Sequence, residues 1–486
     1  MSAAPSAVVI GAGLGGLCVG AQLKKANLQD FVILEKAGKV GGTWRENTYP
    51  GCACDTPVAV YQFSFARTLK WSHLFPRAAE VQRYAEDLTD LSGLRPHLRL
   101  GQGGSAAVWD DARSLWKITT TTGEIREAKV LVMALGQLNR PQLPEIAGRD
   151  SFAGPSFHSA QWNHSVALEG KRVAVIGSAA SAIQLIPEVA KVASHLTVFQ
   201  RSANWILPRL DREVSEAERR LLATASEVSA IEREHLYLQS DAMFWQAFQY
   251  TEAGRAFYTE LALNHLHMQV SDPELRRKLT PDYPIGCKRV LFADDYYPAL
   301  TQKNVSLVTA GIDRIVPEGV VTRDGITHKA DVLVYATGFE TTGWHFSVDI
   351  TGRNGLKLSD AWKNGAEAYL GISVANFPNL FLIYGPNTNL GHNTITFMIE
   401  RQAEYIVQCM KAMQARELSA IEVTKAAQDR FNHDLQERLA KTTWADPSCI
   451  SWYKTPDGRI TQNWGGDTRE YRQATQNVEW SDYSVR

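Results

Sequence analysis

One pattern occurs twice along this chain of 486 residues and restricts the folds open to it. An apolar run at residues 8–10 leads into the glycine motif of residues 11–16, and a second run at 173–176 leads into Gly177. Continuous β-branched runs of this kind indicate strands buried on both faces of a parallel sheet. A glycine turn between such a strand and a helix is typical of dinucleotide binding. We therefore predict an α/β fold with two Rossmann-like domains.

The first glycine motif has the spacing that a bound pyrophosphate requires. Gly11 makes the tight turn, Gly13 allows the phosphates to approach the backbone, and Gly16 allows the helix to pack closely on the strand. Glu35 closes the next apolar run, where a carboxylate accepts hydrogen bonds from a ribose diol. These four residues are the candidate contacts to the first dinucleotide.

The second motif differs from the first at the residue that selects the nucleotide. No acid closes the strand predicted at 196–199, and Arg201 and Ser202 follow it instead. A guanidinium group favours a 2′-phosphate, so the second cofactor is predicted to be NADPH; the alternative is that Arg201 is an ordinary surface residue. Further candidate contacts on this turn and its helix are Gly177, Ser178, Ser181 and Gln184. Two dinucleotides suggest flavin plus nicotinamide, with hydride passing from the second to the first.

Composition excludes several other functions. Lysine and arginine total 51 against 52 acidic residues, which gives no electrostatic case for a nucleic-acid or anionic-membrane partner. Residues 2–23 carry no charge, but five glycines and Pro5 make a signal peptide or membrane span a poor interpretation. The six cysteines are sparse, so we expect reduced thiols in a cytosolic protein, and no metal site is predicted.

Longer motifs identify a family. The pattern Phe152-x-Gly154-x-x-x-His158-x-x-x-Trp162 resembles the fingerprint of the Baeyer–Villiger monooxygenases, the class B flavoprotein monooxygenases, although Asn163 follows where proline or aspartate is usual. The segment 41–55, which contains Gly42, Thr43 and Trp44, resembles the family's other long motif, and Ala336, Thr337 and Gly338 resemble its linker motif.

The resemblance implies a reaction and a set of residues for it. It implies an FAD- and NADPH-dependent enzyme that inserts one oxygen atom of O2 next to a ketone carbonyl through a C4a-peroxyflavin, giving an ester or lactone. The catalytic arginine maps onto Arg289, its paired acid onto Asp55, a contact to NADPH onto Lys288, and a late active-site tryptophan onto Trp452. His158 is implied in a conformational role.

Other interpretations stay open at this point. Arg289 could be a solvated surface residue, and Asp55 could cap a helix. A related flavin monooxygenase would oxygenate amines or thioethers instead of ketones. A flavin-dependent disulfide reductase needs a CxxC motif, whereas Cys52 and Cys54 form CxC. A non-enzymatic protein of the GDP-dissociation-inhibitor type would retain the glycine turn without flavin. The oligomeric state cannot be predicted.

The same motifs divide the chain into parts. We predict a discontinuous FAD-binding domain from residues 1–141 and 367–486, and an NADP-binding domain from residues 152–210 and 281–340. Residues 211–280 have few turn formers and many helix formers, so we predict a helical insertion that could shape the substrate pocket. Ser215 and Glu218 resemble the capping box at its start. The polar stretch from residue 470 is predicted to be a loosely held tail.

Overall fold

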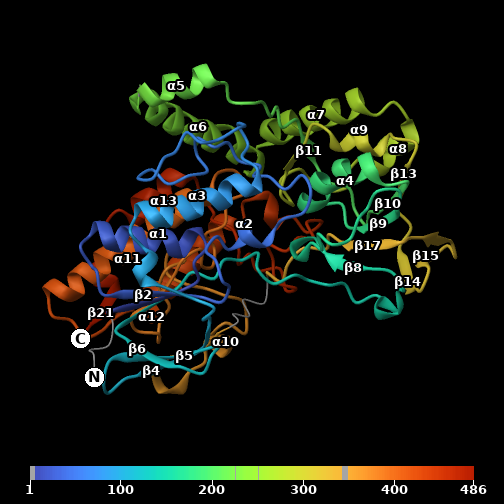
Figure 1. Cartoon of the computed structure of the whole chain (residues 1–486). Coiled ribbons are helices and arrows are strands. Elements are labelled where there is room, and N and C mark those ends of the chain that lie inside the picture. Colours follow the sequence, from blue (N-terminus) through green and yellow to red (C-terminus); the bar gives the residue numbers. More distant parts are fainter. Residues whose placement is uncertain (1–5, 225, 250, 342–347) are drawn as a thin grey trace.

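The computed structural model of the chain describes residues 6–224, 226–249, 251–341 and 348–486. Two five-stranded sheets lie at the centres of two lobes, and a group of helices runs across the top of both (Figure 1). Every apolar run expected to be a strand is one, and the α/β fold class is confirmed.

The sheet of the first lobe has the strand order β19-β7-β1-β2-β3, and all its pairs are parallel. Val8 pairs with Val32 on one side and with Leu131 on the other, so β1 is central and buried on both faces. This explains its continuous apolar sequence. The strands are β1 (Ala7–Ile10), β2 (Phe31–Glu35), β3 (Leu98–Leu100), β7 (Val130–Met133) and β19 (Leu380–Leu382).

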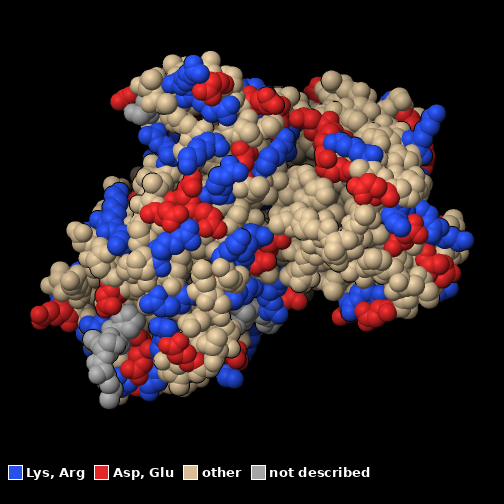
Figure 2. All heavy atoms as spheres, viewed as in Figure 1, with Lys and Arg blue, Asp and Glu red and all other residues tan. Residues whose placement is uncertain are grey.

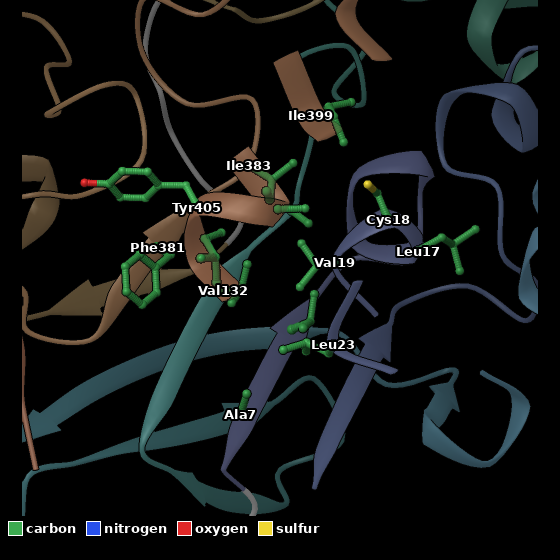
Figure 3. Close-up of a cluster of buried hydrophobic side chains, with 14 of the residues drawn as sticks. Ala7, Leu17, Cys18, Val19, Leu23, Val132, Phe381, Ile383, Ile399 and Tyr405 are labelled. Atoms are coloured by element: carbon green, nitrogen blue, oxygen red, sulfur yellow. The ribbon is translucent and has the colours of Figure 1, made fainter. Parts of the chain in front are cut away.

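Helices α1 (Leu14–Lys25) and α11 (Ile395–Ala415) cover one face of this sheet, together with α3 (Ala78–Leu91). Leu17, Val19 and Leu23 of α1 belong to the same buried cluster as Ile399 and Tyr405 of α11, part of which Figure 3 shows. The helix that follows the first glycine turn is thus held by apolar packing along its length.

A mixed sheet, antiparallel except for the parallel pairing of one edge strand, covers the opposite face of the parallel sheet in the first lobe. Its order is β18-β4-β5-β6, with β4 (Gly104–Asp110), β5 (Leu115–Thr120), β6 (Ile125–Ala128) and β18 (Asp349–Thr351). Trp116 of β5 is fully buried, and its indole N–H donates to the Pro378 carbonyl over 2.9 Å. The predicted domain boundaries leave residues 142–151 and 341–366 unassigned, and β18, within the second of these stretches, pairs with β4 of the first lobe.

The sheet of the second lobe has the order β13-β10-β9-β17-β8 and is also parallel throughout. Its strands are β8 (Ser156–His158), β9 (Arg172–Ile176), β10 (His195–Phe199), β13 (Val305–Val308) and β17 (Val332–Tyr335). Helices α4 (Ala180–Val192) and α9 (Tyr296–Leu300) pack together on it. A small antiparallel sheet of β14 (Ile312–Val316), β15 (Gly319–Thr322) and β16 (Thr327–Lys329) flanks it.

Four helices make up most of the described residues of the segment 211–280, and residues 225 and 250 lie outside the described residues. Its helices are α5 (Glu216–Thr224), α6 (Ser226–Phe248), α7 (Glu252–Gln269) and α8 (Pro273–Leu279). The Ser215 hydroxyl accepts the Glu218 N–H over 3.1 Å, as the predicted cap requires. Trp245, Phe248 and Tyr258 are buried, whereas Phe257 is exposed.

Two sequence-based expectations are wrong in the C-terminal part. The stretch from residue 470 is not a loose tail, because Tyr471 and Tyr483 are buried and β21 (Tyr483–Val485) pairs with β20 (Ile421–Val423). The cysteines are not all reduced, because Cys287 and Cys449 form a disulfide. They lie 162 residues apart in sequence, so their spacing gave no sign of it. The remaining elements here are α10 (Leu358–Ala361), α12 (Lys425–Leu439) and α13 (Thr468–Thr475).

Basic and acidic side chains are interspersed on the face of the molecule in Figure 2, and the described residues in this view form no extended patch of one sign. Within the described ranges, no helix is both long and apolar enough to cross a membrane.

Candidate active site

The first glycine turn needs glycine at two of its three positions. Gly11 has φ +107°, and a Cβ atom there would meet the Ala134 carbonyl oxygen at 2.4 Å. A Cβ atom on Gly16 would meet the Gly11 carbonyl oxygen at 1.8 Å. Gly13 lies against Gly42, so the first glycine turn and the long motif 41–55 share a backbone surface that carries no side chain. No described side chain caps the start of α1, which leaves its N–H groups available to an anion.

Glu35 is fixed beside this turn. Its carboxylate accepts the Ala12 N–H over 2.8 Å and the Ala37 N–H over 3.0 Å, and it is 4% exposed. Arg45, in the short helix α2 (Thr43–Glu46), lies 3.2 Å from the same carboxylate and offsets its burial. Sequence reasoning missed Arg45, whose only sign was that it follows Trp44 in the long motif.

The second glycine turn repeats this geometry. Gly177 has φ +114°, and a Cβ atom there would meet the Ala336 carbonyl oxygen at 2.3 Å. Ser178 is buried, and its hydroxyl donates to the Ser202 carbonyl over 3.3 Å. Ala179 is the N-cap of α4, and none of the described side chains caps that helix start. The start of α4 therefore resembles the start of α1, with free N–H groups at its end.

Arg201, Ser202 and Lys288 come together at the end of β10, although Lys288 lies far along the chain. The Lys288 ammonium donates to the Ser202 hydroxyl over 3.0 Å and lies 4.3 Å from the centre of the Tyr283 ring. Burial lowers the pKa of Lys288, and the neighbouring Arg201 lowers it further. Two cations held this close favour an anion with more than one negative charge between them.

Gln184 and Ser181 lie on α4 where the two lobes meet. The Gln184 amide donates to the Ala53 carbonyl over 2.9 Å, and its oxygen accepts the Tyr49 hydroxyl over 3.0 Å. Ser181 hydrogen-bonds with Tyr49. Gln184 thus connects the helix after the second turn to the long motif of the first lobe, a positioning role for a residue predicted to contact the cofactor.

Asp55 and Arg289, which are 234 residues apart in sequence, form an ion pair with 2.6 Å between Oδ1 and Nη2. The Asp55 carboxylate raises the pKa of Arg289, so this guanidinium keeps its charge. The Arg289 side chain is 44% exposed and that of Asp55 is 20% exposed. One side of the cation is therefore neutralised and the other is open to a ligand. The alternative that Asp55 caps a helix is not what the structure shows.

Aromatic side chains surround this pair. Tyr453 and Tyr384 interact electrostatically with Arg289, and burial raises the pKa of Tyr453 to about 12. Trp452 is half-buried, with its ring 4.5 Å from that of Tyr453. The Trp44 indole donates to the Tyr61 hydroxyl over 3.0 Å. Tyr61, Tyr384 and Tyr453 were missed because none of them belongs to a motif recognised in the sequence.

Cys52 and Cys54 lie close by as free thiols and are buried. Burial raises the pKa of Cys52 to about 11 and that of Cys54 further, so neither forms a thiolate readily. A redox dithiol needs the opposite shift, so the burial of these thiols does not support a disulfide reductase.

His158 lies within the second lobe, where β8 pairs His158 with Tyr335 of β17. It is 1% exposed, and burial lowers its pKa, which the Gly338 backbone partly offsets. Its Nδ1 accepts the Ala160 N–H over 3.1 Å, so the neutral ring carries its proton on Nε2. Thr337 donates to the Gln142 carbonyl over 2.6 Å. The fingerprint histidine thus lies against the linker motif 336–338.

Comparison with known proteins identifies the family. A Baeyer-Villiger monooxygenase of Streptomyces coelicolor is 40% identical over 478 residues, covering 98% of this chain and 92% of that protein. The chain belongs to the Baeyer–Villiger monooxygenase family. A Baeyer-Villiger monooxygenase of Pseudomonas aeruginosa is also 40% identical, over 98% of this chain and 90% of its own length. A phenazine N-monooxygenase of Lysobacter antibioticus is 32% identical over 98% and 96%.

Solved structures agree with this assignment. The structure of OTEMO in complex with FAD and NADP matches with a TM-score of 0.90 at 28% identity, and each chain is covered completely. The closed crystal structure of cyclohexanone monooxygenase matches with a TM-score of 0.89 at 29% identity, over 99% of both chains. The family described as pyridine nucleotide-disulphide oxidoreductase matches residues 8–242.

The chain's own residues fit both cofactors of this Baeyer–Villiger monooxygenase. The bare surface of Gly11, Gly13 and Gly42 suits a pyrophosphate, and a Cβ atom at Gly11 would remove that space. The cationic group of Arg201 and Lys288 suits the extra phosphate of NADPH. The protein is an FAD- and NADPH-dependent flavoprotein monooxygenase, as the resemblance of its longer motifs implies.

Proposed function

We propose that this monooxygenase acts on a ketone and that Arg289 and Asp55 perform the step that a ketone demands. FAD, when bound, supplies the two-electron chemistry that activates O2 and transfers one of its oxygen atoms. Oxygen insertion beside a carbonyl also places negative charge on the carbonyl oxygen of the substrate. A cation that cannot lose its proton stabilises that charge without quenching it.

One observation carries this proposal, namely the ion pair between Asp55 and Arg289, with the guanidinium open on its other side. Asp55 orients the guanidinium through the 2.6 Å contact and offsets its partial burial. The open side is free to donate hydrogen bonds to a substrate oxygen. Trp452, Tyr453 and Tyr384 supply apolar surface that would keep water from the reacting atoms.

The proposal extends to the NADPH site. Lys288 immediately precedes Arg289, so a single segment would contact the 2′-phosphate with one side chain and stabilise the reacting oxygen with the next. His158 and the linker 336–338 would have a conformational role, in which their positions depend on the arrangement of the second lobe. Glu35 would bind the ribose of FAD.

The experiment compares Arg289→Ala with Arg172→Ala, a matched control. Arg172 also forms a 2.6 Å ion pair, with Asp331, and is also 44% exposed, but it lies at the start of β9. Removing one preorganised donor to an oxyanion typically costs about two to three decades in rate. We expect Arg289→Ala to keep flavin reduction by NADPH and to lose ester formation by that factor, while Arg172→Ala keeps both. Normal ester formation by Arg289→Ala would contradict the proposal.

The substrate class is tested with three compounds: one ketone, one amine and one thioether. The phenazine N-monooxygenase among the relatives gives a reason to include the amine. We expect an ester or lactone from the ketone as the main product, identified by mass spectrometry. Efficient oxidation of the amine or thioether, with no ester from any ketone, would favour the alternative activity.

A further inference from the structure

The disulfide between Cys287 and Cys449 joins two segments that both reach Arg289. Cys287 lies two residues before Arg289 in the loop 284–290, which connects the helical insertion to β12 (Leu291–Phe292). Cys449 lies four residues before Tyr453, which interacts electrostatically with Arg289. The covalent bond therefore spans from the loop that holds the cation to the segment that covers it.

The loop of Cys287 has little freedom at its base. Gly286 has φ +89°, and a Cβ atom there would meet the Phe248 ring at 2.4 Å, so this backbone lies directly on the end of α6. Cys287 and Ile285 are buried. The loop is thus anchored by packing as well as by the disulfide.

The segment of Cys449 is anchored differently. Before the cysteine, Trp444 is buried and the Thr443 hydroxyl donates to the Phe248 carbonyl over 3.3 Å. After it, the Lys454 ammonium donates to the Asp446 carbonyl over 3.1 Å. Ile450, directly beside the cysteine, is 83% exposed. The described residues 446–452 thus form a surface loop whose ends are packed and whose middle is held to the Arg289 loop by the disulfide.

We propose that the Cys287–Cys449 disulfide is a redox-sensitive positioning site, which holds the 449–453 segment over Arg289 when oxidised and releases it when reduced by a dithiol. In the reduction, the S–S bond breaks and two electrons and two protons pass to the protein sulfurs, while the dithiol becomes a cyclic disulfide. Because the two cysteines are 0% and 2% exposed, the reductant must reach them through opening of the loop beside Ile450.

Release has a specific consequence for the reaction, and this step rests on the proposed function. With the disulfide open, Tyr453 and the Trp452 ring that lies against it are held less firmly beside Arg289, and water reaches the site more easily. Water diverts activated oxygen to hydrogen peroxide. NADPH consumption then continues while oxygen transfer to substrate falls. Cys287 and Cys449 would act only by positioning these side chains.

The first experiment counts thiols without using activity. The holoenzyme is purified without reductant, denatured, and alkylated. Four labelled cysteines are expected, matching Cys18, Cys52, Cys54 and Cys409, and six are expected after dithiothreitol. Hydrogen exchange of the native protein should rise about tenfold or more in residues 446–454 on reduction. Six labelled cysteines before reduction, or unchanged exchange after it, would overturn the proposal.

The second experiment measures hydrogen peroxide released per NADPH consumed. Cys287→Ser, Cys449→Ser and the double variant are each expected to raise this ratio about three- to tenfold, by the same amount, and to lose any response to dithiothreitol. The control Cys409→Ala, at a free buried cysteine in α11, should respond as the native enzyme does. An unchanged ratio in all three serine variants would refute the positioning role. Failure to oxidise any ketone would count against the proposed function alone, because thiol counts and exchange do not depend on it.

Discussion

The effect of removing the Lys288 charge on the use of NADPH can be calculated from the contacts of this side chain. The ammonium group is held by the Ser202 hydroxyl at 3.0 Å and by the Tyr283 ring at 4.3 Å, so it needs little rearrangement to meet a 2′-phosphate. A hydrogen bond to a charged group contributes about 1.5–3 kcal/mol. At tenfold for each 1.4 kcal/mol, Lys288→Ala should lower kcat/KM for NADPH about 10- to 150-fold.

Arg201→Ala should have a smaller effect, because its side chain is exposed and its charge is screened. An exposed pair contributes about 0.2–1 kcal/mol, so we expect a loss of about fivefold or less. The double variant should lose more than the product of the two factors, because each single removal relieves the repulsion by which Arg201 lowers the pKa of Lys288, and that relief is gained only once.

The assay measures the oxidation of the reduced cofactor and compares kcat/KM for NADPH with kcat/KM for NADH. NADH lacks the phosphate, so its kcat/KM should stay within about twofold to threefold, and Lys303→Ala serves as the control. Lys303 is an exposed lysine just before β13, at the amino end of the sheet, away from the carboxyl ends where ligands bind. An equal fall for both cofactors in Lys288→Ala would refute the assignment.

The same site has a predictable dependence on pH. Burial and Arg201 lower the pKa of Lys288, so the charge needed for the phosphate is lost, as pH rises, earlier than for an ordinary lysine. KM for NADPH should therefore increase on the alkaline side in the native enzyme. Lys288→Arg, whose side chain does not lose its proton in this range, should flatten that increase. An identical profile in both proteins would show that Lys288 does not titrate in the site.

Three further predictions concern other parts of the chain. Glu35→Gln should bind FAD about tenfold more weakly, or about 1.4 kcal/mol, measured by the flavin absorbance retained on dilution; undiminished retention would count against its ribose role. Burial opposes ionisation of Asp241, but hydrogen bonds from His392, Thr468 and Asn393 outweigh it and lower the pKa. The pKa of Asp241 in the folded state is below that in the unfolded state, so this stabilisation is present at pH values above the unfolded-state pKa and is lost as pH falls through the folded-state pKa. Asp241→Asn should therefore flatten the acid side of a plot of urea midpoint against pH. An unchanged slope of that plot would contradict this role. Trp116→Phe leaves the Pro378 carbonyl without its donor and should cost about 1–3 kcal/mol in urea unfolding, whereas a loss near zero would mean that water replaces the indole.

The parts of the fold that could be predicted are those in which one continuous segment of sequence contains the complete pattern of apolar residues. The strands β1, β9 and β10 are buried on both faces over most of their length, so their apolar runs are easily recognised. The antiparallel strands β4 and β5 were missed, because each has one buried and one exposed face and no apolar run. The C-terminal stretch was predicted wrongly because its few anchors, Tyr471 and Tyr483, are dispersed among polar residues.

The residues of the site, too, could be predicted from local sequence only where they belong to one short segment. The glycines of the two turns and Glu35 lie within short motifs, and local geometry determines what they do. Arg289 was located only through the resemblance to a family, since its partner Asp55 comes from the other lobe. The disulfide could not be predicted, because the fold alone brings Cys287 to Cys449.

The order of strands in the first sheet also constrains how the protein is made. The strand β19 adds to the edge of β7, yet it is translated only after the entire second lobe. On the ribosome, β7 therefore waits with an unpaired edge, while the second sheet can be completed as soon as β17 emerges. Such a late, long-range pairing favours slow folding and leaves the unpaired edge of β7 open to aggregation during synthesis. Yields of active enzyme should thus respond to the rate of translation and to chaperones more than the stability of the finished protein suggests.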